Sequence, residues 1–186
     1  MNDTNDTDAQ ANEGGRLASP VGERDHAQGR ADAPVTLVEY GDYECPYCGH
    51  ANAIVKEIQR RLGDRVRFVF RNFPLADVHP HAEHAAEAAE AAAAQGKFWE
   101  MHDYLYGRQQ ALGDEDLAHA AATLGLDADR VTRDLGAHTY LERVREDLRG
   151  GIRSGVEGTP SFFINGVRHD ESYDLETMMA AIARAG

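Results

Sequence analysis

The chain has 186 residues, of which 42% are hydrophobic, so it can bury a sizeable core and needs no disulfide bond to fold. Its 19 basic and 32 acidic residues give a formal net charge of -13 at pH 7, which argues against binding to nucleic acid or to an anionic membrane. The sequence also has no apolar run long enough to span a bilayer, so we expect no membrane insertion.

The first 25 residues differ in composition from the remainder of the chain. They are rich in Asn, Asp, Thr, Gln and Gly and contain no apolar stretch, which predicts a disordered, polar and acidic tail over 1–25. A secretory signal would need a basic start and an apolar run of about 7 to 15 residues, and this segment has neither. We therefore expect a cytoplasmic protein whose folded domain spans 26–186.

A strand, a helix and a second strand follow one another after this tail. Residues 35–41 begin with a β-branched and apolar run that is typical of a buried strand. Residues 46–62 carry apolar side chains at helical spacing, and Gly63 is suited to end that helix. Residues 65–71 again have the pattern of a strand. The three segments predict a βαβ unit with parallel strands and a right-handed crossover.

The only two cysteines of the chain, Cys45 and Cys48, lie between the first strand and the helix. Pro46 suits the first position of a helix, where its missing N–H costs nothing. Cys45 then lies at the helix N-terminus, where unpaired backbone N–H groups and the helix dipole favour a thiolate. Cys48 lies one turn inside the helix and is more shielded. This pattern predicts a redox pair in which Cys45 is the nucleophile and Cys48 resolves the mixed disulfide.

A zinc site is one alternative interpretation of the cysteine pair. It would need two further ligands, and only histidines could supply them, because the chain has no other cysteine. His50 is close in sequence, whereas His79, His81 and His84 lie further along the chain. His81 and His84 would share one helix face, but without a pattern of carboxylates beside them we interpret these histidines as structural. We predict no metal site. A purely structural disulfide is also unfavourable, since so short a loop restricts the unfolded chain little.

The middle of the chain, over residues 78–137, has helical patterns and no strand signal. It contains an alanine-rich segment, a second helix over 97–106, and two shorter helices for which Asp114 and Asp127 are the expected N-caps. A longer helix from about 139 to 154 follows. The sequence thus predicts an all-helical insertion.

The C-terminal part returns to strand patterns. Thr159-Pro160 leads into residues 161–164, which read as a strand, and Asn165-Gly166 is a strong signal for a hairpin to the next strand over 167–169. A proline here would be tolerated at the first residue of the strand in trans, or in a tight turn in cis. A last helix over 175–185 is expected to cover the sheet.

Three motifs of this sequence, taken in order, resemble the DsbA-like branch of the thioredoxin superfamily. They are residues 33–48, which end in Cys45-Pro46-Tyr47-Cys48, residues 68–75 and residues 158–166. The resemblance runs from about residue 26 to the C-terminus. It implies an α/β, thioredoxin-like fold, with a central mixed sheet flanked by helices and an inserted all-helical subdomain.

The same resemblance implies roles for two residues far from the cysteines in sequence. In thioredoxin-like proteins the proline equivalent to Pro160 is cis and lies beside the cysteine pair. The backbone of the preceding residue, Thr159 here, is then free to pair with an extended substrate. The resemblance therefore assigns substrate positioning to Thr159 and Pro160, and an ordinary turn before a strand is the alternative.

Glu39 is a further candidate site residue. An acid in an otherwise apolar strand is costly to bury unless its pKa rises or a partner compensates its charge. Glu39 lies six residues before Cys45, where thioredoxin-like proteins, including DsbA, keep a buried acid that exchanges a proton with the second cysteine. The alternative, that Glu39 points to solvent or to an arginine, stays open.

Pro46 and Tyr47, between the cysteines, are expected to tune the reduction potential. Strongly oxidising DsbA proteins have a histidine where Tyr47 stands, and Pro-Tyr is typical of glutaredoxins. We therefore expect a potential below the DsbA value of about -120 mV and nearer the glutaredoxin range of about -200 to -230 mV. Oxidase, reductase and glutathione-dependent roles all remain open on this ground.

Together these features predict a thiol–disulfide oxidoreductase that exchanges electrons with protein disulfides through Cys45 and Cys48 and needs no cofactor. The expected partners are protein or peptide thiols and disulfides, together with a thioredoxin- or glutathione-type redox partner. A redox-gated chaperone or peptide-binding protein, with the same pair as its switch, is the alternative from another functional class.

Overall fold

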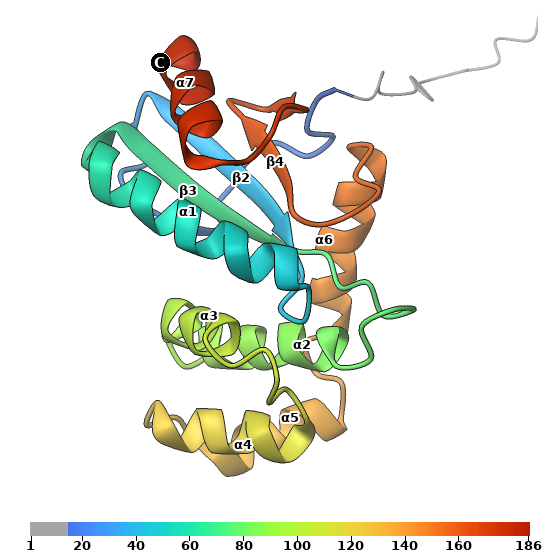
Figure 1. Ribbon diagram of the computed structural model, residues 1–186. Coiled ribbons are helices and arrows are strands. Elements are labelled where there is room, and N and C mark those ends of the chain that lie inside the picture. The colour runs from blue at the N-terminus through green and yellow to red at the C-terminus, as the bar shows by residue number, and fades with distance from the viewer. Residues whose placement is uncertain (1–14) are drawn as a thin grey trace, which may run out of the picture.

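The computed structural model describes residues 15–186 (Figure 1). In chain order its elements are β1 (His26–Gln28), β2 (Val35–Gly41), α1 (Pro46–Leu62), the 3-10 turn η1 (Gly63–Arg65), β3 (Val66–Asn72), α2 (Ala82–Ala93), α3 (Phe98–Tyr106), α4 (Asp114–Thr123), α5 (Ala128–Gly136), α6 (Leu141–Arg153), β4 (Ser161–Ile164), β5 (Val167–His169) and α7 (Leu175–Ala185).

The strands form one sheet in the order β1-β3-β2-β4-β5. β2 and β3 are parallel, and the other neighbours are antiparallel, so the sheet is mixed, as the sequence predicts. Helix α1 connects β2 to β3, which confirms the predicted βαβ unit. Strand β1 is an addition that sequence patterns do not indicate, since its three residues are too few to show an alternation.

Both faces of the sheet are buried, and successive residues of β2 are divided between them. Leu37 belongs to the core that includes Val55 and Ile58 of α1, whereas Val38 belongs to a smaller core with Phe163 on the opposite face. This division follows from the alternating direction of side chains along a strand. Helices α1 and α7 therefore lie on the same side of the sheet as Leu37 (Figure 1).

The helices α2 to α5 form a separate layer beneath the sheet, and α6 leads from this layer back to β4 (Figure 1). Most alanines of α2 are buried, and their small side chains allow the neighbouring helices to pack closely. Asp127 caps α5, because its side chain accepts a hydrogen bond from the N–H of Arg130. The expected cap at Asp114 is wrong by one position. Gly113 precedes α4, and its N–H donates to the Asp116 carboxylate at 3.2 Å.

The Asn165-Gly166 hairpin between β4 and β5 is present as predicted. Both residues have positive φ values, 48° and 79°, and the strands pair directly on either side of them, with Ile164 opposite Val167. This backbone conformation is the reason for Asn-Gly in tight hairpins, because glycine and asparagine enter it with little steric cost.

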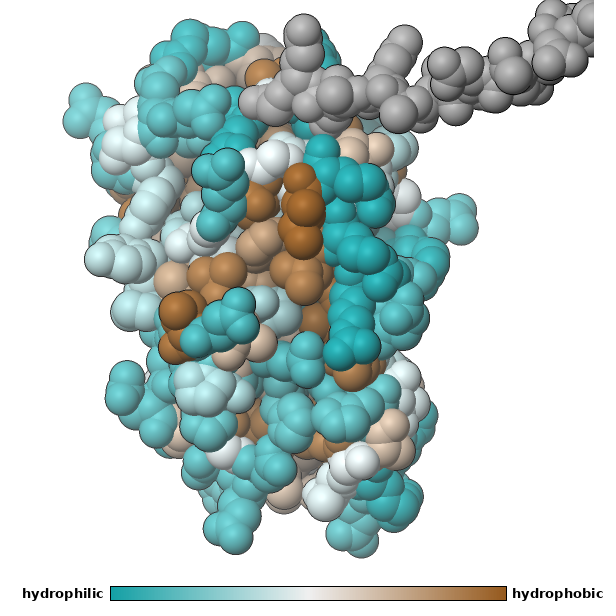
Figure 2. All heavy atoms as spheres, turned by 90° about the vertical axis from the view of Figure 1, so that its right-hand side faces the viewer, coloured by the Kyte–Doolittle hydropathy of each residue, from teal (hydrophilic) through white to brown (hydrophobic). Residues whose placement is uncertain are grey.

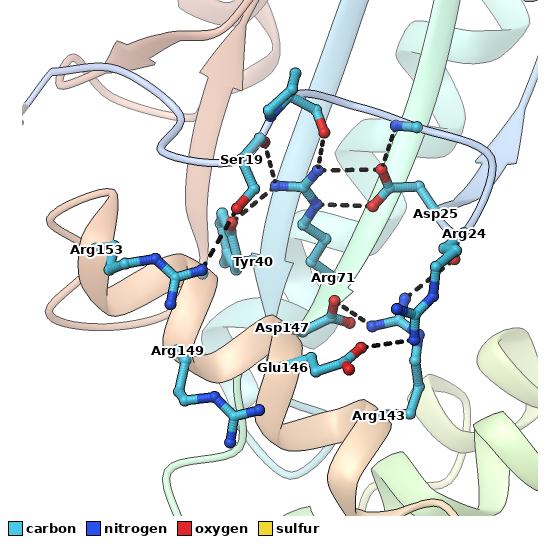
Figure 3. Close-up of a pocket in the computed structure, with 13 residues that line it drawn as sticks. Ser19, Arg24, Asp25, Tyr40, Arg71, Arg143, Glu146, Asp147, Arg149 and Arg153 are labelled. Atoms are coloured by element: carbon cyan, nitrogen blue, oxygen red, sulfur yellow. Dashed lines mark hydrogen bonds and ion pairs between the residues drawn. The ribbon is translucent and has the colours of Figure 1, made fainter. Parts of the chain in front are cut away.

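The segment before β1 is held against the sheet through Arg71 of β3, as Figure 3 shows. The Arg71 guanidinium donates to both carboxylate oxygens of Asp25, at 2.8 and 3.0 Å, and to the carbonyl of Ser19 at 3.0 Å. These contacts lie in a pocket of about 440 Å³ beside α6. The predicted tail thus divides into two parts. Residues 15–25 run along the domain, and residues 1–14 lie outside the described residues.

The side of the molecule on which α6 lies is shown in Figure 2. Hydrophilic residues cover most of this face, and apolar side chains gather in a band along its middle. Within residues 15–186, none of the helices combines the length and the apolar character that crossing a bilayer requires.

Candidate active site

Cys45 lies where β2 has ended and α1 begins. It is the N-cap residue of α1, with an extended backbone (φ -70°, ψ 119°), and Pro46 occupies the first turn of the helix. The first turn of the helix closes with a hydrogen bond from the N–H of Gly49 to the Cys45 carbonyl. The Cys45 sulfur therefore lies at the positive end of the helix, as the sequence predicts.

Both cysteines carry free thiols and are buried, but their surroundings affect them in opposite ways. The pKa of Cys45 is lowered from 9.0 to about 5, chiefly because the Cys48 side chain hydrogen-bonds to it. Hydrogen bonds from Thr159 and from backbone groups of the first helical turn add to this effect and outweigh burial. At pH 7 Cys45 is therefore almost entirely a thiolate, which is the nucleophilic form.

Cys48 keeps its proton. Its burial raises the pKa of the thiol, and the hydrogen bond to Cys45 and the negative charge of Glu39 raise it further. The backbone N–H of Asp42 donates to the Cys48 sulfur at 3.5 Å, which opposes this shift. The two sulfurs thus differ in protonation at neutral pH, with Cys45 as the thiolate and Cys48 as the thiol.

Glu39 is buried in the middle of the sheet, with only 1% of its surface exposed. It is paired with Phe70 of β3 and Phe162 of β4, and its Oε1 atom has no hydrogen-bond partner among the described residues. Burial, and to a lesser degree the charge of Cys45, raises the pKa of this carboxyl to about 8. The alternative that Glu39 points to solvent is therefore excluded, and the side chain is a neutral acid at pH 7.

The loop that enters β4 lies directly against Cys45. The Cys45 sulfur lies 3.5 Å from the Thr159 carbonyl oxygen, although 114 positions separate the two residues in the chain. The Thr159-Pro160 peptide bond is cis. Thr159 and Pro160 are half-buried, so this loop is partly exposed beside the buried Cys45.

Pro46 and Tyr47, between the cysteines, are exposed. Tyr47 has 66% of its surface exposed, which makes it one of the few large apolar side chains on the surface of the described residues. Its backbone, and not its ring, acts on the nucleophile, through one of the hydrogen bonds that lower the pKa of Cys45.

Asp42 is a residue of the site that the sequence analysis does not identify. Its carboxylate is buried and accepts hydrogen bonds from the N–H groups of Glu44 at 2.8 Å and Cys45 at 3.3 Å. It also accepts from the N–H of Leu75 and pairs with Nδ1 of His79, both at 2.8 Å. Asp42 thereby ties the loop before Cys45 to the segment that follows β3. An aspartate shortly before a helix start was the available signal.

Gln109 is the second such residue, and it belongs to the helical insertion. Its Nε2 donates to the carbonyls of Tyr43 at 2.9 Å and Cys45 at 2.8 Å. A Cβ atom on Gly49 would lie 2.2 Å from the Gln109 Oε1 atom, so the glycine provides the space for this side chain. No pattern in the sequence identifies Gln109, because the contact depends on how the insertion packs against the first turn of α1.

A family model described as Thioredoxin matches residues 22–184. Among solved structures, the chain is similar to oxidised BdbD from Bacillus subtilis, with 26% identity and a TM-score of 0.78 over 86% of this chain and 91% of that one. It is also similar to a thioredoxin-like oxidoreductase from Silicibacter pomeroyi, with 29% identity and a TM-score of 0.77 over 87% of this chain and 91% of that one. Wolbachia pipientis alpha-DsbA1, at 19% identity and a TM-score of 0.76 over 91% of this chain and 94% of that one, shares the fold.

Similar sequences also occur as parts of much longer proteins. The Na(+)/H(+) antiporter NhaA 1 of Salinispora arenicola is 50% identical over 163 residues, which are 88% of this chain and 25% of the antiporter. The Na(+)/H(+) antiporter NhaA of Herminiimonas arsenicoxydans is 45% identical over 167 residues, which are 89% of this chain and 26% of that one. The chain thus spans about a quarter of the length of the curated relatives it matches.

Proposed function

Because this chain belongs to the thioredoxin family, as its three motifs predict, we propose that it catalyses thiol–disulfide exchange with protein or peptide disulfides through Cys45 and Cys48. The observation that carries the proposal is the opposite protonation of the two sulfurs, with the pKa of Cys45 lowered to about 5 and that of Cys48 raised. A metal ion or an organic cofactor is not required for this chemistry.

In the first step the Cys45 thiolate attacks one sulfur of a substrate disulfide. A bond forms between Cys45 and that sulfur, the substrate S–S bond breaks, and the departing thiolate takes a proton from solvent. The helix N-terminus and the hydrogen bond from Cys48 hold the negative charge on Cys45 before the attack.

In the second step Cys48 resolves the mixed disulfide. Its thiol loses a proton, and the new thiolate attacks the Cys45 sulfur. The bond between Cys45 and the substrate breaks, and the substrate sulfur that was bonded to Cys45 departs as a thiolate that is then protonated. We propose that Glu39 accepts the proton of Cys48 in its ionised form, directly or through water. Formation of the mixed disulfide removes the charge of Cys45, which is one cause of the raised pKa of Glu39, and so increases the ionised fraction. A carboxyl with a pKa of about 8 is matched to proton exchange near neutral pH. The products are a reduced substrate and a Cys45–Cys48 disulfide, and the reverse sequence oxidises a dithiol.

Substrate positioning is assigned to Thr159 because its carbonyl contacts Cys45, and to Pro160 because it follows Thr159 in the same loop. The Thr159 carbonyl lies 3.5 Å from the sulfur that would be bonded to the substrate, so a peptide extended along this loop would hold its own sulfur beside Cys45. The exposed ring of Tyr47, two residues after the nucleophile, supplies apolar contact area.

The direction of electron flow depends on the potential of the pair and on the compartment. Neither residue between the cysteines is a histidine that could stabilise the thiolate. We therefore propose a reduction potential of the Cys45–Cys48 pair near the range of about -200 to -230 mV. In a reducing cytoplasm such a pair would rest as a dithiol and act as a reductase, with a thioredoxin- or glutathione-type system as its electron donor.

The proposal is tested by equilibrating the chain with glutathione buffers and measuring disulfide exchange with a protein substrate. Cys48→Ser is expected to accumulate a mixed disulfide, because the attacking sulfur is retained and the resolving sulfur is lost. Cys45→Ser should form no mixed disulfide and should abolish turnover. Equal turnover by wild type and Cys45→Ser would refute the assignment. Undiminished binding of unfolded peptides by a Cys45→Ser, Cys48→Ser double variant, without turnover by wild type, would favour a peptide-binding role.

The antiporter relatives support a second candidate function, in which the thiol pair regulates a Na(+)/H(+) antiporter. In those proteins a segment similar to most of this chain is part of the antiporter chain itself. Antiport in vesicles that contain such an antiporter together with this chain would be measured with the pair oxidised and reduced. A redox-dependent rate that is lost in Cys45→Ser is expected, and an equal rate in both redox states would dismiss the idea.

A further inference from the structure

A second group of polar side chains lies in the helical layer, where α2 meets the turn between α5 and α6. His84 and Glu87 are one helical turn apart on α2, and His138 lies in the connection between α5 and α6. Each offers a nitrogen or oxygen atom, and these atoms all lie within 4.8 Å of one another. The two imidazole rings are 5.4 Å apart between centroids. The mechanism above uses none of the three.

Glu87 is the residue that needs an explanation. Its surface is 0% exposed, and only one of its oxygens is satisfied, because Nδ1 of His138 lies 2.9 Å from Oε1. The other oxygen, Oε2, is buried without a hydrogen-bond partner among the described residues. A buried carboxylate oxygen without a partner costs free energy. The ion pair with His138 therefore satisfies only one of the two carboxylate oxygens.

His84 is held in place by a further carboxylate. Its Nδ1 lies 2.7 Å from Oδ1 of Asp114, the first residue of α4. This contact orients the ring and leaves Nε2 as the nitrogen that can bind a ligand. A carboxylate behind a histidine is the usual arrangement around protein-bound zinc, where it fixes the ring and raises the basicity of the coordinating nitrogen.

We propose that His84, Glu87 and His138 bind a divalent transition-metal ion, with Zn²⁺ as the species of best fit. Two imidazoles and one carboxylate form a nitrogen and oxygen donor set that zinc accepts readily, whereas Ca²⁺ and Mg²⁺ prefer oxygen ligands alone. Zinc binds such atoms at about 2.0 to 2.1 Å, so ligands of a tetrahedral ion lie about 3.3 Å apart. The donor atoms already lie within 4.8 Å of one another, and His138 is exposed, so a shift of the His138 ring and small adjustments of the other two side chains would bring the ligands to that spacing.

The ion would join two parts of the insertion that are distant in sequence. It would replace the proton shared by His138 and Glu87 and would neutralise the buried carboxylate, including its unpaired oxygen. The proposal departs from the sequence-based interpretation of His84 as structural. That interpretation lacked a carboxylate beside the histidines. Glu87 supplies a carboxylate from the same helix as His84, and the fold adds His138, which lies 54 positions after His84 in the chain.

The test is a zinc titration of the full chain with the cysteine pair oxidised, so that neither sulfur can act as a ligand. Competition with a chromophoric chelator should give one tightly bound Zn²⁺ per chain, and added Zn²⁺ should raise the melting temperature. Glu87→Gln and His84→Ala should each weaken binding at least tenfold. His138→Asn should do the same, and asparagine tolerates the positive φ of 51° at this position.

His119→Ala is the matched control, since His119 is an exposed histidine on the neighbouring helix α4, and it should bind zinc as wild type does. X-ray absorption of the zinc-loaded wild type needs no variant and should show imidazole scattering with no sulfur. Absence of stoichiometric binding, binding unaffected by Glu87→Gln and His138→Asn, or a zinc spectrum without imidazole would each overturn the proposal.

Discussion

Replacing Glu39 by glutamine tests how the ionisation of this buried acid changes the stability of the protein with pH. The side chain is 1% exposed, and burial raises the pKa of its carboxyl from 4.5 to about 8. Glutamine has nearly the same shape but does not titrate. The Glu39→Gln variant therefore removes one ionisable group from the core and leaves the packing around Phe70 and Phe162 close to that of wild type.

The magnitude follows from the difference in pKa between the folded and unfolded chains. Between pH 4.5 and about 8 the folded wild type holds a proton on Glu39 that the unfolded chain has lost. Its free energy of unfolding therefore falls by about 1.36 kcal/mol per pH unit across this window. The contribution of Glu39 to the free energy of unfolding is complete below pH 4.5 and is lost as the pH rises towards 8. From pH 5 to pH 7 the loss from Glu39 is about 2 to 3 kcal/mol, and the variant does not suffer it. Burial, the largest cause of the raised pKa, is the same in the disulfide form, where the charge of Cys45 is absent.

The assay is urea unfolding of the disulfide form of both proteins at pH 5, 6 and 7. The disulfide form is needed because the lowered pKa of Cys45 in the dithiol gives the opposite slope, with stability gained between pH 5 and 9. Any constant cost of burying the amide cancels when the two pH values are compared. Glu100→Gln, at an exposed position of α3, is the matched control and should follow wild type. An unchanged difference between Glu39→Gln and wild type from pH 5 to pH 7 would refute the reasoning.

Other consequences of the structure can be measured on the same protein. Ultraviolet absorbance of the Cys45 thiolate should titrate with a midpoint near pH 5, and Cys48→Ala should raise the midpoint, because the largest cause of the lowered pKa is removed; an unshifted midpoint would contradict this. Gly49→Ala should slow disulfide exchange, since the new Cβ would displace the Gln109 amide from the carbonyls of Tyr43 and Cys45; its stability should change by no more than about 1 kcal/mol, because the displaced group is the end of a flexible side chain, and an unchanged exchange rate would count against the clash. Asp127→Ala should lower the free energy of unfolding by about 1 kcal/mol in urea, and no change would mean that the cap contributes little.

The local sequence determined the elements around the cysteine pair. Helix α1 has the predicted bounds, and β3 begins one residue later than expected, because each is specified by its own apolar periodicity and by Pro46 and Gly63 at the ends of the helix. The hairpin at Asn165-Gly166 was equally predictable, since few residues other than glycine and asparagine enter its backbone conformation readily. Strand β1 was not, because its pairing with β3 depends on a partner far along the chain.

The chemistry of the site was decided only by the tertiary structure. Sequence placed Glu39 in a strand, but whether it faced solvent or the core depended on what covers β2, and only burial raises the pKa of its carboxyl. Asp42, in the loop before Cys45, contacts Leu75 in the segment after β3. Gln109, in the helical insertion, donates to the carbonyl of Cys45. The approach of Thr159 to Cys45 likewise spans 114 positions. Periodicity and capping act over a few residues, whereas pKa values and side-chain contacts depend on neighbours that are brought together only when the chain folds.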